Sequence, residues 1–353
     1  RIISTTPRMI SKNIIKVIFS DVDGTLVHYH KHDNDNNQHQ GREESCLSNN
    51  ETAKAVNGDD SSSIIHLPPS STGMQGIISR ETHNLVSTLR ETKQVKFVLV
   101  SGMRSTTLIQ RIPFLPRADA YCSESGGRIF YPVASGSSSR GNGDGETTAE
   151  AAVITLQEDM DWRQIMQRND AAGVDGYGGN MDGVVTRRDD VISTTPIEER
   201  KGLLWDFARF LIERGWNLDY KGYATSFRIK FTAGFAGSPD ELREILPSEL
   251  SCSVNLGMSD VYPKSSGKAK CCEYLSKRFD AKSLFEECVC ICDDDNDIEM
   301  ALACGHAYLP SVTSESMVLT VQTNPDHFTV ACHDGVSGTD ATDAALRAIL
   351  EQF

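Results

Sequence analysis

Two carboxylates stand two residues apart near the start of the chain, in "VIFSDVDGTLV" (17–27). Asp21 and Asp23 follow a run of apolar residues, and Gly24 and Thr25 come directly after them. Carboxylates this close repel each other unless a positive charge lies between them. A carboxylate can attack phosphorus to form an aspartyl-phosphate, and a second group must then protonate the leaving oxygen and activate water. The spacing favours Asp21 as the nucleophile and Asp23 as the general acid and base.

A second acidic stretch, "DDDND" (293–297), holds four carboxylates in five residues directly after the apolar run "CVCIC" (288–292). An isolated acidic run is usually a solvated loop. A run that ends a buried strand, in a chain with another acidic strand end, favours a metal site instead. Mg²⁺ is typically held by one or two carboxylates together with waters and substrate phosphate. We therefore expect Asp21 and Asp293 to share a Mg²⁺ ion.

Phosphoryl transfer also needs a cation and hydrogen-bond donors for the charge on the phosphoryl oxygens. Lys268, in "YPKSSGKAK", and Ser101, at the end of "VKFVLVS", can supply them. Taken alone, Lys268 would be interpreted as a solvated lysine.

Three apolar segments are typical of buried strands that position these groups: 14–19, 95–102 and 288–292. A helix is expected between the first two, over 78–93, and a strand–helix–strand order implies a parallel sheet. Further helices are expected at 267–279, 297–304 and 340–353. Because ligands of open parallel sheets bind outside the carboxyl ends of the strands, the polar residues that follow these strands can converge on one pocket.

The segment 151–262 has a different character and contains all three tryptophans of the chain. A helix is predicted over 196–215 and strands over 223–231 and 252–263, which indicates an α+β insert before the sheet resumes at 263. Ser226, Arg228 and Lys230 share one face of the strand 223–231. If that face points inward, they bind sugar hydroxyls or an anion; if it points outward, they form a solvated basic face.

Two tracts are too polar to bury enough surface for a stable fold. We interpret 28–72 as a disordered insertion and 134–150 as a low-complexity loop in the first part of the core (14–150). Residues 33–44 match several positions of a calcium loop, but Gln38 stands where that loop needs glycine, so we interpret the match as coincidence. Residues 1–13 form a leader, either disordered or the end of an organelle transit peptide.

The composition narrows the function. The chain has 353 residues and a formal net charge of −14, which argues against nucleic acid as a partner. The sequence contains no stretch of about 20 apolar residues, so it predicts no membrane span. Of the ten cysteines, Cys271 and Cys272 are adjacent and three more, at 288, 290 and 292, alternate in an apolar run, which indicates buried thiols in a reducing compartment. We expect the cytoplasm, with an organelle such as a plastid as the alternative.

These motifs resemble, in order, the four motifs of the haloacid dehalogenase (HAD) phosphatase superfamily: "DVDGT", Ser101 at a strand end, Lys268 and "DDDND". The spacing of "PKSSGK" and the "D-x-x-N-D" tail resemble the C2-capped (type IIB) branch, which includes sucrose-phosphatase-like and Cof-like sugar-phosphate phosphatases. The resemblance implies an α/β fold, with a Rossmann-like HAD core around a parallel sheet and an inserted α+β C2-type cap.

The resemblance also implies roles for single residues. Asp21 matches the nucleophile, and Asp23 matches the general acid and base whose backbone carbonyl also binds Mg²⁺. Ser101 matches the phosphate-binding hydroxyl and Lys268 the charge-stabilising lysine. The other matches are the metal-site residues Asp293, Asn296 and Asp297 and the glycine turn Gly126 and Gly127. Apart from these matches, we expect a second set of residues to bind substrate: Gly24, Thr25, Gly102, Ser226 and Arg228.

Three positions depart from the family pattern. Cys292 stands where glycine is frequent, and Asp294 adds a charge where a small residue is common. Arg104 is displaced by one residue, so we assign it no catalytic role. The expected activity is a Mg²⁺-dependent phosphatase acting on a sugar phosphate or similar small metabolite. The alternatives are a sugar phosphomutase on the same core and a catalytically silent regulator that binds sugar phosphate.

Overall fold

The computed structural model describes residues 15–29, 63–69, 75–133, 155–168, 182–193, 195–255, 257–333 and 335–353. The leader, the calcium-like stretch and the loop 134–150 lie outside the described residues. The chain forms two compact units. The first contains Arg1–Val100, Phe114–Arg117 and Lys268–Phe353, and the second contains Ser101–Pro113 and Ala118–Gly267. The domain boundaries at 150 and 262 stay a prediction.

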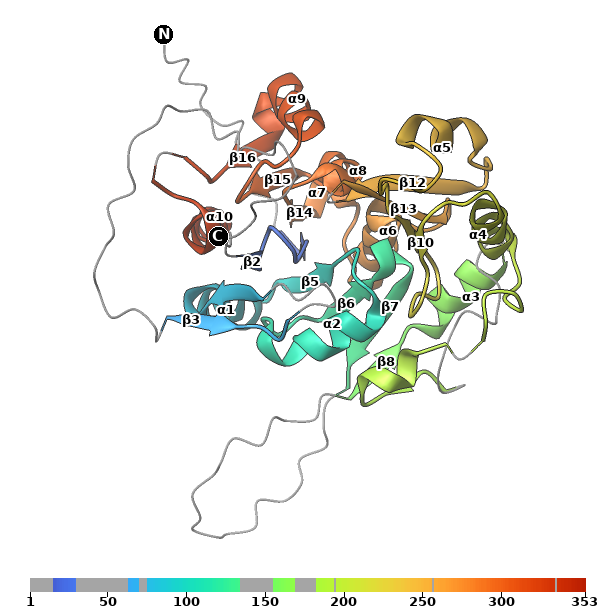
Figure 1. Cartoon of the computed structure of the whole chain (residues 1–353). Coiled ribbons are helices and arrows are strands. Elements are labelled where there is room, and N and C mark those ends of the chain that lie inside the picture. Colours follow the sequence, from blue (N-terminus) through green and yellow to red (C-terminus); the bar gives the residue numbers. More distant parts are fainter. Residues whose placement is uncertain are drawn as a thin grey trace. The chain divides into compact units, whose positions relative to one another are not determined.

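The first unit contains five parallel strands in the order β16-β15-β14-β1-β5 (Figure 1). Their bounds are β1 (Val17–Ser20), β5 (Lys96–Val100), β14 (Cys288–Ile291), β15 (His306–Leu309) and β16 (Phe328–Val330). Every residue of the central strands β1 and β14 is buried. The buried strands and the parallel sheet that the sequence predicted are therefore present. Strands buried on both faces are typical of a parallel sheet covered by helices on each side.

Helices of the first unit pack in two groups. Helix α1 (Arg80–Ser87) contacts α10 (Gly338–Leu350), and α6 (Lys268–Arg278) contacts α7 (Leu284–Glu287) and α8 (Ile298–Ala303). Helix α9 (Glu315–Thr323) follows β15. The helix predicted over 78–93 is α1 continued by a π-helical turn, Thr88–Thr92, and the side chain of Ser79 caps its start by accepting from Thr82 N.

A small antiparallel sheet in the first unit has the order β2-β4-β3. It consists of β2 (His28–Tyr29), β3 (Ile64–His66) and β4 (Gly76–Ser79). The prediction of disorder over 28–72 is wrong at β2 and β3. The β-branched Ile64 and Ile65 favour a strand and pair with β4. This pairing stabilises β3 although the residues around it are polar.

The second unit begins with an antiparallel ladder in the order β6-β7-β8-β9. The strands are β6 (Ala120–Ser123), β7 (Arg128–Pro132), β8 (Leu156–Glu158) and β9 (Val184–Val185), accompanied by α2 (Ser105–Arg111) and α3 (Met160–Arg168). The glycine turn predicted between β6 and β7 is present, with Gly126 at φ +86°. Strands β8 and β9 extend this ladder beyond β7, and the salt bridge of Arg128 on β7 with Glu158 on β8 is buried.

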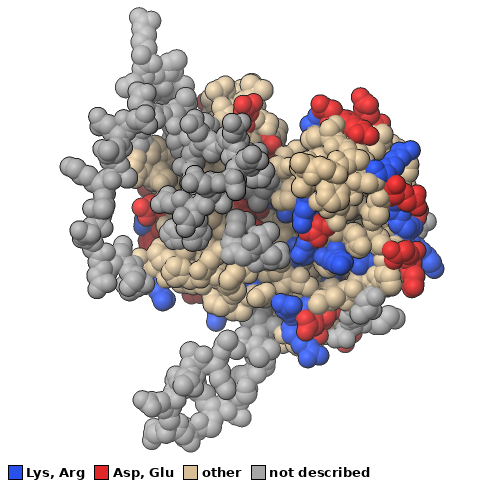
Figure 2. Space-filling view, in the orientation of Figure 1, with Lys and Arg blue, Asp and Glu red and all other residues tan. Residues whose placement is uncertain are grey.

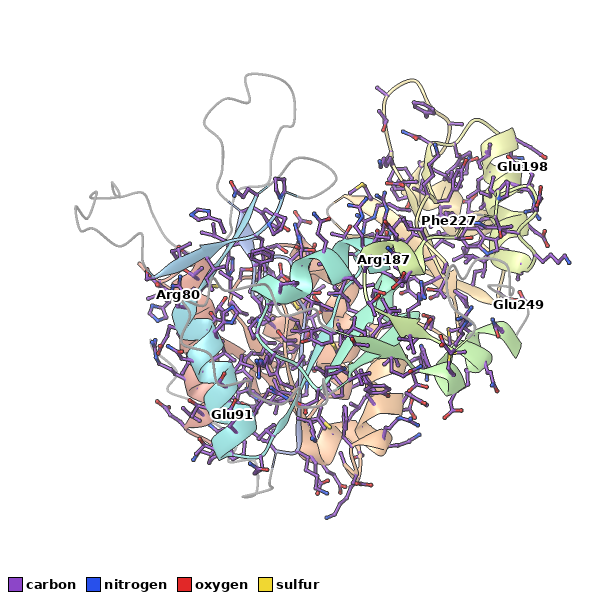
Figure 3. All side chains as sticks on the ribbon, turned by 90° about the horizontal axis from the view of Figure 1, so that it is seen from below. Arg80, Glu91, Arg187, Glu198, Phe227 and Glu249 are labelled. Carbon is purple, nitrogen blue, oxygen red and sulfur yellow. The ribbon has the colours of Figure 1, made fainter. Side chains whose placement is uncertain are left out.

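A second sheet in this unit has the order β10-β11-β13-β12. Its strands are β10 (Leu218–Asp219), β11 (Phe227–Ile229), β12 (Leu250–Asn255) and β13 (Met258–Pro263), with the helices α4 (Leu203–Glu213) and α5 (Pro239–Ile245). Phe227, labelled in Figure 3, and Ile229 pack into a core with Trp205 of α4. The predicted α+β insert is therefore confirmed, although α4 starts seven residues later than we expected because Gly202, at φ +102°, breaks the helix.

Candidate active site

Three carboxylates meet at one edge of the parallel sheet in the first unit. Asp21 directly follows β1, whereas Asp293 and Asp297 follow β14, the neighbouring strand. One oxygen of each carboxylate lies within 4.8 Å of the others, and all three side chains are buried. Because β1 and β14 are parallel, their carboxyl ends lie at the same edge, which is how residues 272 positions apart come together. The predicted convergence of these two motifs is present.

Lys268, the first residue of α6, lies between two of these carboxylates. Its Nζ donates to Asp21 Oδ1 at 2.6 Å and to Asp297 Oδ1 at 2.7 Å. The side chain of Lys268 is only 2% exposed, so it is not the solvated lysine that its sequence alone would suggest. Burial opposes its charge, but the two carboxylates outweigh burial and raise the pKa of Lys268 above its ordinary value.

If all three carboxylates were ionised, they would carry more negative charge than one ammonium can neutralise. Burial raises the pKa of Asp21 to about 8, although Lys268 acts in the opposite direction. Burial and the neighbouring carboxylates also raise the pKa of Asp293 well above its ordinary value. Among the described residues, Asp297 Oδ2 and Asp294 Oδ1 are buried without a hydrogen-bond partner. A set of buried, unneutralised oxygen donors fits a hard divalent cation such as Mg²⁺.

The loop after β1 is built against Asp293. Thr25 Oγ1 donates to Asp293 Oδ1 at 2.8 Å. Gly24 has φ +86°, and a Cβ at this position would lie 2.2 Å from Asp293 Oδ2. Only glycine permits both this backbone conformation and this close approach. Gly24 and Thr25 thus position a metal-site carboxylate; their predicted contact with substrate stays a prediction.

A chain of hydrogen bonds joins this loop to the C-terminal helix. The hydroxyl of Thr342, on α10, donates to the carbonyl oxygen of Thr25, and His28 Nε2 lies 2.8 Å from the same hydroxyl. Because that hydroxyl has only one proton to donate, His28 Nε2 is the donor to Thr342. Burial lowers the pKa of His28 to about 4, which keeps the ring neutral at physiological pH. Sequence analysis missed both residues, since neither belongs to a spacing pattern.

Asp23 contacts the sheet that follows it. Its backbone bridges Val27, and Gly24 N donates to Val27 O at 2.8 Å, so the chain turns back on itself. After this turn, the hydroxyl of Tyr29 on β2 donates to Asp23 Oδ1. No sequence signal identified Tyr29.

Ser101 and Gly102 directly follow β5 and belong to the second unit. Both are buried, and Ser101 Oγ accepts from Met103 N at 3.1 Å. Their phosphate-binding role stays a prediction. Asn296 lies in the turn between Asp293 and Asp297, and its role in metal binding is likewise a prediction. Cys292, where the family favours glycine, is fully buried.

Both basic residues on the predicted substrate face, Arg228 and Lys230, are paired with acidic residues of the second unit. Arg228 makes two hydrogen bonds to Asp260, at 2.6 and 2.8 Å, and Lys230 lies 3.1 Å from Asp219. Ser226 is buried, whereas the side chain of Lys230 is 42% exposed. Among the described residues in Figure 2, acidic side chains lie beside the basic ones. The charge of Arg228 is thus already paired with Asp260. To contact substrate as predicted, its guanidinium would have to bind substrate and Asp260 at the same time.

Comparison with models of protein families finds no match, and comparison with curated protein sequences finds none either. Solved structures do match. The sucrose-phosphatase from Synechocystis sp., in complex with sucrose and phosphate, has a TM-score of 0.54 and 12% identity, over 96% of this chain and 98% of that one.

Two further structures are similar at lower scores. The HAD phosphatase BT1666 from Bacteroides thetaiotaomicron has a TM-score of 0.47 and 16% identity, over 99% of this chain and 98% of that one. The HAD subclass IIB sugar phosphatase BT4131 has a TM-score of 0.46 and 14% identity, over 95% and 98%. The likeness to sucrose-phosphatase confirms the predicted fold: an α/β core with an α+β insert. None of the described helices has the length and apolar character that a bilayer crossing needs.

Proposed function

We propose that this protein is a Mg²⁺-dependent phosphomonoester phosphatase that acts on a sugar phosphate or a similar small phosphorylated metabolite. The observation that carries the proposal is the buried cluster in which Lys268 bridges Asp21 and Asp297 beside Asp293. Burying three carboxylates costs free energy. Such a cluster is therefore expected where a cation neutralises the carboxylates or where they take part in catalysis. Similarity of fold to a sucrose-phosphatase supports the substrate class by analogy only.

In the proposed reaction, Asp21 attacks phosphorus and the bond from phosphorus to the ester oxygen breaks. Asp23 gives its proton to that leaving oxygen and then takes a proton from the water that hydrolyses the phosphoaspartate. Lys268 holds Asp21 in place and balances its charge. A Mg²⁺ ion held by Asp21, Asp293 and the carbonyl oxygen of Asp23 would supply positive charge for the phosphoryl oxygens. Ser101 and Gly102 would donate hydrogen bonds to the same oxygens.

The proposal includes a cellular compartment and a kind of partner. The nine described cysteines are all free thiols, which supports a reducing compartment, with the cytoplasm as the expected location. The proposed partner is a small phosphorylated metabolite and not a nucleic acid, in line with the formal charge of −14.

The test is release of inorganic phosphate from an aryl phosphate and from a panel of sugar phosphates, with Mg²⁺ and with a chelator. Asp21→Asn should lower the rate at least about 10³-fold, because a nucleophile cannot be replaced by its neutral amide. Asp240→Asn, at an exposed position on α5, is the matched control and should leave the rate unchanged.

The same assay separates the alternatives. A phosphomutase would rearrange a hexose phosphate without releasing inorganic phosphate, and a silent binding protein would do neither. Release that persists in Asp21→Asn would show that the nucleophile is another residue. Release that is unaffected by chelation would contradict the metal requirement.

A further inference from the structure

Tyr29 contacts the residue that we assign as the general acid and base. Its hydroxyl donates to Asp23 Oδ1, and no motif in the sequence assigns Tyr29 a role. The contact is made possible by the tight turn between them, in which Leu26 N and Val27 N both donate to Val22 O. The turn reverses the chain, so that β2 brings Tyr29 back to Asp23, six residues earlier.

The small sheet holds the ring of Tyr29 in this place. Tyr29 pairs with Gly76 of β4 across the strands. A Cβ at Gly76 would lie 2.4 Å from Val27 Cγ1 and 3.4 Å from Tyr29 Cε1, so the absence of a side chain leaves room for both residues. Tyr29 is partly buried between the turn and β4 and is therefore not a freely rotating surface side chain.

A hydrogen bond from a phenol to one carboxylate oxygen has two consequences for proton transfer. It fixes the rotation of the carboxylate about its last side-chain bond, so that the transferable proton resides on the other oxygen, Oδ2. It is also stronger when Asp23 is ionised, because hydrogen bonds to charged acceptors are stronger than those between neutral groups. Asp23 is ionised just after it has donated its proton to the leaving group.

We propose that Tyr29 is a positioning residue for Asp23 that selectively assists departure of poor leaving groups. The inference rests on the proposed function, because it needs Asp23 to act as the general acid. As the ester bond breaks, the proton moves from Asp23 Oδ2 to the leaving oxygen, and the negative charge left on Asp23 is stabilised at Oδ1 by Tyr29. In the second half of the reaction, a proton of the attacking water returns to Oδ2.

The test uses two aryl phosphates and the full chain with Mg²⁺. The departing 4-nitrophenolate is a weak base and leaves without a proton, whereas phenolate is a stronger base and needs one. For Tyr29→Phe, kcat/KM should fall about tenfold on phenyl phosphate and less than about twofold on 4-nitrophenyl phosphate. The ratio kcat/KM reports the steps up to departure of the leaving group, so slow hydrolysis of the phosphoaspartate cannot mask the effect.

Two further variants make the result specific. Tyr131→Phe removes a similar bond, from the Tyr131 hydroxyl to Asp159 Oδ2 at 2.7 Å in the second unit, and should leave both rates unchanged. In an Asp23→Asn background, Tyr29→Phe should have no further effect on the ratio of the two rates, because the acid that it positions is gone. The urea midpoint of each variant shows that the fold is retained.

The possible failures can be told apart. If the wild-type protein releases phosphate, Asp23→Asn changes the ratio and Tyr29→Phe does not, the role of Tyr29 is wrong while the proposed function stands. An equal fall on both substrates would also overturn the inference, since it would show a general structural effect. If the wild-type protein hydrolyses neither substrate, the proposed function fails and this inference fails with it.

Discussion

Replacement of Lys268 by methionine tests the centre of the site. Methionine keeps most of the side-chain volume but removes the ammonium that lies 2.6 Å from Asp21 Oδ1 and 2.7 Å from Asp297 Oδ1. The Asp21 and Asp297 side chains are 7% and 0% exposed, so water cannot replace the lost partner. The variant therefore leaves two buried carboxylates without their shared cation.

The expected loss in free energy of unfolding follows from these contacts. Breaking a buried ion pair by removing one partner costs about 3–5 kcal/mol. The two carboxylates share one ammonium, and both can take up protons once it is gone, which limits the cost near neutral pH. We therefore expect a loss of about 3 kcal/mol in the absence of Mg²⁺, and a fall of about 10²–10³ in kcat with Mg²⁺.

The assay is urea unfolding at neutral pH with a chelator present, together with phosphate release in Mg²⁺. The control is Lys270→Met on the same helix, where the lysine is 59% exposed and lies 3.5 Å from Glu273. Such a surface pair contributes at most about 1 kcal/mol. Equal unfolding free energies for the two variants would refute the idea that Lys268 is the buried counter-ion of the site.

Three other changes have defined outcomes. Gly24→Ala should lower kcat/KM about 100-fold, because its Cβ would lie 2.2 Å from Asp293 Oδ2 and displace that carboxylate; Gly234→Ala, at φ +90° in open space, is the control. A Mg²⁺ concentration of about 100 times Kd should stabilise the wild type by about 2.7 kcal/mol, and Asp293→Asn should abolish most of this gain. His28 has a pKa lowered from 6.5 to about 4, so the folded state resists its protonation and stability falls as pH drops below 6.5. The loss should reach about 2 kcal/mol between neutral pH and pH 5, and His28→Gln should remove that part of the pH dependence.

Each of these outcomes can fail in a recognisable way. Gly24→Ala with the activity of Gly234→Ala would show that the loop does not fix Asp293. Equal stabilisation of the wild type and Asp293→Asn by Mg²⁺ in thermal unfolding would place the ion elsewhere. An unchanged slope of unfolding free energy against pH in His28→Gln would mean that His28 is accessible to protons in the folded state.

The acidic part of the site could be predicted from the sequence because it depends on strand ends. Asp21 and Asp293 each follow a short apolar run, and parallel strands bring such ends to one edge of the sheet. The role of Lys268 was predictable only together with the acids, since a lysine at the start of a helix has no signal of its own. Its burial between Asp21 and Asp297 depends on how α6 packs, and periodicity does not encode this.

The supporting contacts could not be predicted for a related reason. Thr342 and Thr25 are 317 residues apart and meet only because α10 packs near the loop. His28 and Tyr29 lie at the start of a tract whose polar composition concealed the strand β2. In the second unit, Arg228 and Asp260 were both visible in the sequence, but their pairing follows from the register of β11 with β13. Register is set by packing of the whole sheet.

The most direct test of the account is detection of the covalent intermediate. The protein would be mixed with Mg²⁺ and an aryl phosphate that it hydrolyses, and the reaction would be stopped with acid within one turnover. The protein would then be digested and analysed by mass spectrometry. The account predicts a phosphoryl group on Asp21 that forms and disappears at rates consistent with turnover, and that is absent from Asp21→Asn. Rapid phosphate release with the phosphoryl group on another residue, or release that is undiminished in Asp21→Asn, would contradict it.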